Sequence, residues 1–351
     1  MNTPHIQNQK LKVLVIRFSS IGDIVLCSPV LRCLKKMEDK NTEVHFLTRN
    51  SFRSFMQYNP HVDKLITIEK KTREVLPDLR SENYDFVIDL HNNLRSRKVT
   101  FQLGKPCQRF YKLNIQKWLL TNFHQIKMPD LHIVDRYLDA ALPLGVTNDQ
   151  QGLDFFIPDE EPVPWEVLPE RFRKGFTGFV IGGTYSTKRL PTTKIIETCR
   201  QINHPVLLLG GPEDAETGIM IAQSAGDHVW STCGKFSLLK SADLVKKSRC
   251  IITHDTGLMH IAAAFHKPVA SVWGNTVPEF GMYPYFPAGM NNGSKIFEIK
   301  NLSCRPCSKI GYDHCPKKHF NCMNKINEKY LAEWANRIFN NFHQTHLQKN
   351  H

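Results

Sequence analysis

One aspartate, Asp23, lies where a parallel sheet would present it to a ligand. The short apolar run Lys12–Arg17 comes shortly before it, and Gly22 allows a tight turn directly in front of the carboxylate. Ile24–Lys36 then has helical spacing, so the sequence predicts a strand, a turn and a helix. Ligands of open α/β sheets bind at the carboxyl ends of the strands. Asp23 is therefore a candidate ligand contact, although it could equally serve only to cap the helix that follows.

A basic, glycine-rich loop opens the second half of the chain. The segment Gly182–Pro191 follows a predicted strand and precedes a predicted helix. Its hydroxyl groups and backbone amides could approach phosphate oxygens, and Lys188 adds a compact positive charge. The spacing departs from the Walker A pattern, which argues against nucleotide hydrolysis. Taken alone, the loop could be purely structural.

Two further turns offer groups that suit a nucleotide. His254–His260 opens a helix directly after a predicted strand, so free amides and the positive end of the helix could face a pyrophosphate. Gly210–Asp214 ends another strand with two carboxylates, a familiar arrangement for binding ribose hydroxyls. In both turns the acidic residue could instead stabilise the start of the helix. His260 could be a satisfied, partly buried histidine.

Strands alternate with helices in both halves, which predicts parallel, doubly wound sheets. The 351 residues, 41% of them hydrophobic, suit two domains of about 150 residues. Pro158–Pro169 combines four prolines with acidic residues and has the composition of a linker. Strands are expected first at Glu43–Leu47, Lys64–Ile68 and Phe86–Leu90. After the linker, strands and helices are expected at Gly178–Gly182, Thr192–Gln201, Pro205–Leu209, Glu213–Ala225, Cys250–Thr253, Gly257–Phe265 and Pro268–Trp273.

The charge of the chain favours an anionic partner. Its 46 Lys and Arg residues against 33 Asp and Glu residues leave a net charge of +13, which suits nucleic acid, an anionic membrane face or a phosphorylated substrate. Between Leu90 and Pro129 there are eight basic residues and no acidic one, with aromatic residues interleaved. This stretch predicts an anion-binding or membrane-surface region, although it could be only a solvated basic face. Its basic residues are Arg95, Arg97, Lys98, Lys105, Arg109, Lys112, Lys117 and Lys127.

The sequence contains no apolar run of the ~20 residues that a membrane span needs. Its polar first residues also lack the apolar core of a signal peptide. We therefore expect a cytoplasmic protein.

Taken together, the motifs resemble glycosyltransferase family 9, the family of the ADP-heptose:lipopolysaccharide heptosyltransferases, in its heptosyltransferase II-like branch. The resemblance covers most of the chain and implies the α/β GT-B fold, in which two Rossmann-like, doubly wound parallel-sheet domains face a central cleft. We expect an acceptor-binding domain over residues 1–160, a donor-binding domain over 170–324 and a last helix within 325–345 that packs back on the N-terminal domain. The motifs that carry the resemblance are Arg17–Asp23, Asp89–Ser96, Lys188–Pro191, Gly210–Asp214 and His254–His260.

The resemblance also implies an inverting transfer of heptose from ADP-heptose to the lipopolysaccharide inner core. Asp23 matches the general base, and Lys188 with the helix start at Thr256–Gly257 matches the groups that stabilise the departing diphosphate. Leu190 departs from the family, which often has tryptophan there. Donor contacts are expected from Thr184, Lys188, Asp214, Asp255, Thr256, Gly257 and His260, with Glu213 as the alternative to Asp214. Acceptor contacts are expected from Ser20, Gly22, His91, Arg95 and Arg97.

The acceptor implied by the resemblance is an anionic lipid A-Kdo or heptosyl saccharide. An enzyme that uses it would act peripherally, in transient contact with the cytoplasmic face of the inner membrane. No metal is obligatory in this scheme. Four of the ten cysteines have spacing that suggests a structural zinc site rather than disulfides in a cytoplasmic protein. They are Cys304, Cys307, Cys315 and Cys322.

Three alternative functions remain open at this point. A transferase of the same fold could use another nucleotide sugar. A nucleic-acid-binding protein with a zinc module would explain the charge and the cysteines, but it leaves Asp23 and the paired Rossmann pattern unexplained. A nucleotide-sugar epimerase or dehydrogenase would need a G-x-G-x-x-G fingerprint, which neither half contains.

Overall fold

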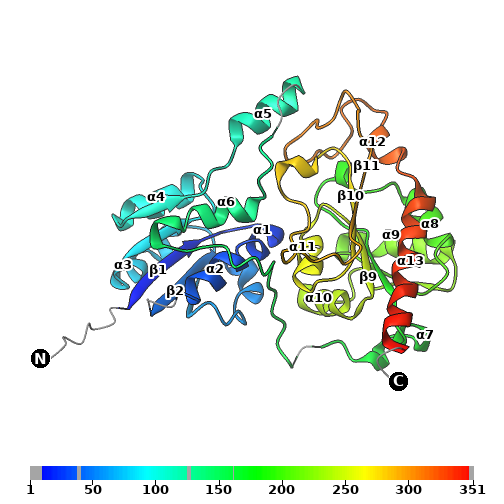
Figure 1. Cartoon of the computed structure of the whole chain (residues 1–351), viewed down its shortest axis with the longest axis horizontal. Helices are drawn as coiled ribbons and strands as arrows, with labels where there is room; N and C mark the ends of the chain where they lie inside the picture. The colour runs from blue at the N-terminus through cyan, green and yellow to red at the C-terminus, as the bar shows by residue number, and fades with distance from the viewer. Residues whose placement is uncertain (1–9, 38–40, 125–127, 161, 348–351) are drawn as a thin grey trace, which may run out of the picture. The chain divides into compact units, whose positions relative to one another are not determined.

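The computed structural model describes residues 10–37, 41–124, 128–160 and 162–347. The chain divides into two compact units, Met1–Lys112 with Ile133–Phe156 and Leu113–His132 with Ile157–His351. Each unit has its own parallel sheet (Figure 1). Lys127 of the basic stretch and Glu161 of the expected linker lie outside the described residues.

The first unit is built on a five-stranded sheet in the order β3-β2-β1-β4-β5, with every pair of neighbours parallel. Val13–Ile16 of its central strand is completely buried, as expected for a parallel sheet covered on both faces. The strands are β1 (Leu11–Ile16), β2 (Thr42–Arg49), β3 (Lys64–Ile68), β4 (Phe86–Asp89) and β5 (Cys107–Arg109). The helices are α1 (Ile21–Val25), α2 (Ser28–Lys35), α3 (Leu76–Ser81), α4 (Leu94–Leu103) and α6 (Ile133–Asp139), with 3-10 turns at Asn50–Phe55, Thr72–Glu74 and Leu142–Leu144.

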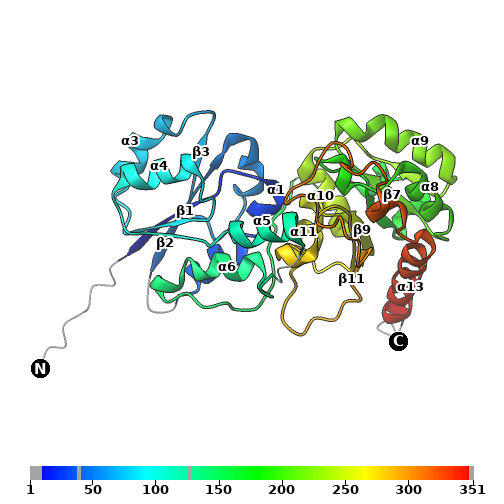
Figure 2. The ribbon, with the colours of Figure 1, turned by 90° about the horizontal axis from the view of Figure 1, so that it is seen from above.

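The second unit is built on a six-stranded parallel sheet in the order β11-β10-β9-β6-β7-β8. Its strands are β6 (Thr177–Val180), β7 (Val206–Leu209), β8 (Val229–Ser231), β9 (Cys250–His254), β10 (Val269–Trp273) and β11 (Lys295–Glu298). Its helices are α5 (Asn114–Phe123), α7 (Glu170–Arg173), α8 (Thr192–Arg200), α9 (Ala215–Ala225), α10 (Leu238–Lys247), α11 (Gly257–Ala264), α12 (Asn321–Asn324) and α13 (Glu328–Leu347). Short 3-10 turns lie at Trp165–Val167, Ser186–Lys188, Pro212–Asp214 and Pro278–Phe280. Figure 2 shows α8 and α9 side by side on this unit.

Both sheets reverse their strand order beside their first strand. The reversal falls between β1 and β4 in the first sheet and between β6 and β9 in the second. Doubly wound sheets bind ligands at this switch point, outside the carboxyl ends of the strands. The structure therefore confirms the predicted pair of Rossmann-like domains, and it identifies the loops in which a site belongs.

The last helix, α13, belongs to the second unit, and its expected packing on the N-terminal domain stays a prediction. Leu331, Trp334 and Ile338 are buried in the hydrophobic core of the second unit. The Trp334 indole donates a hydrogen bond to the Gly293 carbonyl at 2.8 Å. The spacing of these apolar residues brings one face of α13 against α8, β9 and β10.

Leu113–His132 is grouped with the second unit, although it falls within the expected N-terminal domain. The Lys117 ammonium lies 5.6 Å from the centroid of the Phe280 ring. The Lys309 ammonium donates to the Asn114 carbonyl at 3.3 Å. Both contacts attach α5 to loops of the second unit. In the described part of the chain, no helix has the length and apolar character needed to cross a membrane.

Candidate active site

Asp23 lies in the first turn of α1, where both of its oxygens are held. Its Oδ2 accepts hydrogen bonds from the Ser20 amide at 3.1 Å and the Ser20 hydroxyl at 2.8 Å. Its Oδ1 pairs with Arg17 Nη2 at 2.7 Å. The side chain thus does cap its helix, and the ion pair also fixes it beside the carboxyl end of β1.

Arg17 connects this turn to the neighbouring strand. It is 8% exposed, and its Nε donates to the Ser19 carbonyl at 2.7 Å while Nη1 donates to the Leu90 carbonyl. The Tyr137 hydroxyl donates to Asp23 Oδ1 at 3.4 Å. Arg17 and Tyr137 were not among the predicted site residues. Arg17 stands in the first motif, whereas no local signal links Tyr137 to a residue 114 positions earlier.

The surroundings of Asp23 determine its charge. Burial by itself would raise the pKa of Asp23, but the charge of Arg17 and the hydrogen bonds from Ser20 outweigh it, so the pKa lies below its ordinary value. Burial raises the pKa of Tyr137 well above its ordinary value, so the phenol stays neutral. Asp23 is therefore an ionised carboxylate at neutral pH, able to accept a proton.

The loop after β4 adjoins the loop after β1, because Ile16 and Asp89 are paired in the sheet. Asp89 is completely buried and organises this loop. Its Oδ1 accepts from the amides of His91 at 3.0 Å and Asn92 at 2.7 Å, and its Oδ2 accepts from the Ser96 hydroxyl at 2.8 Å. Asp89 is thus a structural residue that shapes the loop.

His91 lies close to the Asp23 turn. Its ring contacts Phe18 edge-on, with centroids 5.1 Å apart. Burial, with the nearby charges of Arg17 and Lys112, lowers the pKa of His91 to about 4, so the ring is neutral at pH 7. Its Nδ1 is buried without a hydrogen-bond partner among the described residues. A neutral imidazole with a free nitrogen can bind a sugar hydroxyl.

The predicted acceptor residues thus fall into two groups. Ser20 and Gly22 precede Asp23 in its turn, and His91 lies in the adjoining loop. Arg95 and Arg97 follow at the start of α4 and are exposed; Arg97 Nε donates to Asn92 Oδ1 at 3.0 Å. Their contact with an acceptor stays a prediction.

Lys188 and Asp255 meet in the second unit, at the switch point between β6 and β9. Lys188 Nζ lies 2.6 Å from Asp255 Oδ2, which also accepts from the Thr276 hydroxyl at 3.1 Å. The ammonium is mostly shielded, with 16% of the Lys188 side chain exposed. A diphosphate bound here would offer this lysine a second anionic partner.

The start of α11 has the geometry of an anion site. Thr256 is the N-cap residue, but its side chain makes no capping hydrogen bond; its hydroxyl lies 3.3 Å from that of Thr253. The first amides of the eight-residue helix, from Gly257 onward, therefore have no side-chain cap and can face an anion. His260 is 2% exposed inside the same helix. Its predicted donor contact stays a prediction, as does that of the exposed Thr184.

The Gly182–Pro191 loop is held by buried contacts. His254 Nε2 accepts from the Leu190 amide at 2.9 Å, and burial lowers the pKa of His254 to about 4, which keeps the ring neutral. Leu190 is part of the hydrophobic core, so the departure from tryptophan is accommodated by packing. Thr187 exchanges hydrogen bonds with the backbone of Tyr312, which fixes the turn that carries Lys188.

Asp214 joins two loops rather than facing solvent. It is 2% exposed, its Oδ1 pairs with Arg189 Nη1 at 2.8 Å, and its Oδ2 accepts from the Gly211 amide at 2.9 Å. A Cβ on Gly182 would lie 2.4 Å from Asp214 Oδ2, so any larger residue there would require the carboxylate to move. Its neighbour Glu213 is exposed.

The four cysteines are free thiols in the structure. Burial, with the neighbouring Cys304 and Cys315, raises the pKa of Cys307 to about 11. Cys304 Sγ lies 3.7 Å from His319 Nε2. Among the described residues, three or more metal-ligating atoms lie within 4.8 Å of one another only at Glu43, His45 and Glu82. The carboxylates of that group are already paired with Lys10, Lys12 and Lys64.

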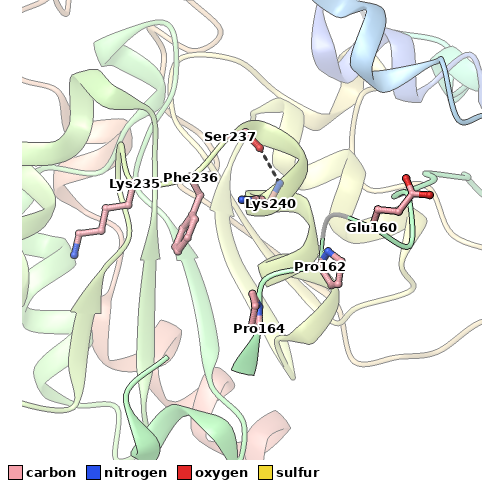
Figure 3. A pocket seen from close by; sticks show the side chains of 7 residues that line it. All are labelled: Glu160, Pro162, Pro164, Lys235, Phe236, Ser237 and Lys240. Atoms are coloured by element: carbon pink, nitrogen blue, oxygen red, sulfur yellow. Dashed lines mark hydrogen bonds between the residues drawn. The ribbon is translucent and has the colours of Figure 1, made fainter. Parts of the chain in front are cut away.

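A hollow in the second unit lies apart from the Lys188–Asp255 pair. Ser237 caps α10 in its wall, with the hydroxyl accepting from the Lys240 amide at 3.3 Å (Figure 3). None of the predicted site residues lines it. The lining residues are Glu160, Pro162, Pro164, Lys235, Phe236, Ser237 and Lys240.

The two Rossmann-like domains, each with its own parallel sheet, are the architecture of the GT-B class. The sequence profile of glycosyltransferase family 9 (heptosyltransferase) matches residues 72–313. The chain belongs to this family.

Two similar proteins and one solved structure cover between 77% and 97% of this chain. It is 26% identical to lipopolysaccharide heptosyltransferase 1 of Campylobacter coli, over 94% of this chain and 99% of that protein. It is also 26% identical to lipooligosaccharide heptosyltransferase 2 of Haemophilus influenzae, over 77% and 85%. Among solved structures, E. coli ADP-heptose lps heptosyltransferase II superposes with a TM-score of 0.70 at 20% identity, over 97% of this chain and 100% of that chain.

Proposed function

We propose that the protein transfers a heptose from ADP-heptose to the lipopolysaccharide inner core with inversion at the anomeric carbon. The observation that carries the proposal is that one unit holds an ionised Asp23 and the other holds an anion site at Lys188 and the start of α11. The names of the relatives supply the sugar and the acceptor class. A transferase that uses another nucleotide sugar remains the alternative.

In this mechanism the acceptor hydroxyl gives its proton to Asp23 as its oxygen attacks the anomeric carbon. Asp23 starts ionised because Arg17 and Ser20 hold it so. The low pKa makes it a weak base, which suits a reaction in which the proton moves late. Arg17 and Tyr137 orient the carboxylate and do not exchange protons themselves.

The departing ADP is stabilised on the second unit. Lys188 would turn from Asp255 toward the diphosphate, and the first amides of α11 would donate to its oxygens. Because a lysine and amides neutralise the leaving group, the mechanism requires no metal.

For the ribose contact we favour Glu213 over Asp214. Asp214 is buried and engaged by Arg189 and Gly211, whereas Glu213 is exposed on the same turn. Either residue places a carboxylate after a Rossmann strand, where ribose hydroxyls are commonly bound. Replacement of Glu213 by glutamine should raise the KM for the donor without lowering the free energy of unfolding.

The proposed acceptor-binding residues are chosen by their charge, and the proposed location of the enzyme rests on the acceptor that such residues suit. The exposed Arg95 and Arg97 suit the phosphates or acidic sugars of a Kdo-bearing lipid, which would place the enzyme in the cytoplasm at the inner membrane surface. The domain roles proposed above, with acceptor binding in the N-terminal part and donor binding in the C-terminal part, accord with this distribution.

A structural zinc at Cys304, Cys307, Cys315 and Cys322 is proposed as separate from catalysis. Cys304 and Cys315 are close enough to Cys307 to influence its pKa. Metal analysis of protein purified without chelator should find about one zinc per chain. The same analysis should find no zinc in a variant with all four of these cysteines replaced by serine. Absence of metal from the unmodified protein would refute the site.

The function is tested by measuring ADP or other nucleotide release with a panel of nucleotide sugars and Kdo-bearing acceptors. We expect release with ADP-heptose that depends on the acceptor. Faster turnover with a different nucleotide sugar would favour the alternative transferase.

A further inference from the structure

Helix α5 carries an exposed apolar side. Ile115, Trp118 and Phe123 are exposed by 68%, 49% and 55%, and none of the ten residues of the helix is buried. These three side chains, with the partly exposed Leu119, fall on one face at helical spacing. An ordinary surface helix does the reverse and buries such a face against its core.

The polar side of α5 is the side that rests on the second unit. Lys117 lies over the Phe280 ring at 5.6 Å, and the Thr121 hydroxyl donates back to the Lys117 carbonyl. At the start of the helix, the Lys309 ammonium donates a hydrogen bond to the Asn114 carbonyl at 3.3 Å. The contacts of Lys117 and Asn114 thus join the polar side and the start of α5 to the second unit.

The loop that contacts α5 has the same surface character. Lys309 is exposed, and Ile310 beside it is 59% exposed. Trp118 and Phe123 lie edge to face, with ring centroids 5.5 Å apart, and form one aromatic cluster on the outside of the helix. Apolar and aromatic side chains on one side of a helix with lysine on the other are the composition of interfacial membrane helices.

From this arrangement we propose that the outer face of α5 (Ile115, Trp118, Leu119 and Phe123) inserts into the interface of an anionic phospholipid bilayer. The charge of the stretch supports this occupant, because Leu90–Pro129 has eight basic residues and no acidic one. Anionic lipid attracts such segments, and tryptophan favours the headgroup level.

A second helix of the same stretch has a matching composition within the first unit. On α4, Leu94 and Phe101 are 87% and 85% exposed and lie on one face with the exposed Lys98. The basic stretch therefore contributes lipid-suited surface twice, on two separate helices.

A second copy of the chain fits this face less well. A ten-residue helix is about 15 Å long, so its face is far smaller than the roughly 800 Å² per partner that a stable dimer buries. Two chains of net charge +13 also repel one another. Binding to an anionic membrane requires no such minimum area, and the negative lipids attract the positive charge of the chain.

The inference deepens the proposed membrane contact and does not depend on which sugar is transferred. Flotation of the full chain is measured with vesicles of phosphatidylcholine alone and with about one third phosphatidylglycerol. The test variant is Ile115→Ser, Trp118→Ser, Phe123→Ser. The matched control is Ile219→Ser, Met220→Ser on α9, which removes exposed apolar side chains from another helix of the same unit.

We expect the unmodified protein and the α9 control to bind the anionic vesicles, and the α5 variant to lose about tenfold or more of that binding. Equal binding by the α5 variant would overturn the proposal, as would a wild-type protein that does not float. Dissociation of a dimer by the α5 substitutions with unchanged vesicle binding would assign the face to a second copy instead.

A second measurement avoids the risk that the triple variant misfolds. Trp118 fluorescence, taken as the difference between the unmodified protein and Trp118→Phe, should shift to the blue and be quenched by brominated lipid on anionic vesicles. An unchanged spectrum would contradict insertion. Failure of heptosyl transfer would appear separately, as absent ADP release on a delipidated acceptor by protein that still binds vesicles.

Discussion

At the scale of single residues, Asp23 is controlled by Arg17. The guanidinium is 2.7 Å from the carboxylate and is anchored to the carbonyls of Ser19 and Leu90. Burial would otherwise favour the neutral acid. The charge of the base therefore depends on a buried arginine that we expect to touch neither substrate.

This dependence predicts the pH profile of the reaction. The pKa of Asp23 is depressed, so activity should persist as the pH falls until it passes through that low pKa. Arg17→Met removes the opposing charge, and the acid limb of kcat/KM should move to higher pH by about one to three units. Arg17→Lys should restore part of the shift. An acid limb that stays in place in a folded Arg17→Met variant would contradict this role.

Lys188 should act on the donor rather than on the acceptor. Lys188→Met should raise the KM for the donor and lower kcat, together by about a hundredfold or more in kcat/KM, because it removes a charge that stabilises the leaving group. Lys194→Met, which removes a lysine paired with Glu328 on the surface of α8, is the control and should leave both constants near their original values. Initial rates at varied donor concentration give both constants for each variant; unchanged constants in Lys188→Met would contradict the role of Lys188.

Sequence reasoning identified most residues at the switch points but not how they are held. Asp23, Lys188 and Asp255 stand in recognisable turns, so their positions at the carboxyl ends of strands could be predicted. Arg17 and Tyr137 could not, because their partnership with Asp23 depends on tertiary packing. The burial of Asp214, which bears on the choice between it and Glu213 as the ribose contact, is likewise visible only in the fold.

At the scale of elements, the loops after β6 and β7 are pressed together. Gly182 leaves room for Asp214 Oδ2, which a Cβ would approach at 2.4 Å, whereas a Cβ on Gly183 would meet its nearest neighbour at 3.4 Å. Close packing of this kind tolerates no extra methyl group unless a neighbour moves.

Gly182→Ala should therefore lower the free energy of unfolding by about 1–3 kcal/mol. Gly183→Ala, one residue further along the same loop, should change it by less than about 0.5 kcal/mol. Denaturant unfolding of the two variants tests the prediction. Equal stability would mean that the Arg189–Asp214 contact yields easily.

The long periodic elements of the fold were predictable, and the short ones were not. Strands such as Lys64–Ile68 stand out as apolar β-branched runs, and β9 differs from its expectation by one residue. The three-residue strands β5 and β8 are too short to leave a pattern. Helix α5 is also hard to read, because its apolar face points outward, against the usual rule.

At the scale of the whole molecule, the net charge of +13 favours anionic substrates over a neutral environment. Much of the excess is exposed, on α4 for example, whereas Lys188 is largely shielded. Salt screens exposed charges more than buried ones.

Ionic strength should therefore separate the two substrates. As salt rises from about 0.05 to 0.5 M, the apparent KM for an anionic lipid acceptor should increase several-fold more than the KM for the donor. Arg95→Ala with Arg97→Ala should reduce that difference. A donor KM that rises as steeply as the acceptor KM would contradict the proposed division of charge.

The role of Asp23 as the general base is tested most directly by the rate of acceptor-dependent ADP release from ADP-heptose by the Asp23→Asn variant. Asparagine keeps the shape of the side chain but cannot take the proton, so we predict a fall in kcat of at least about a hundredfold, with donor binding retained in calorimetry. A rate equal to that of the unmodified protein would remove Asp23 from the mechanism.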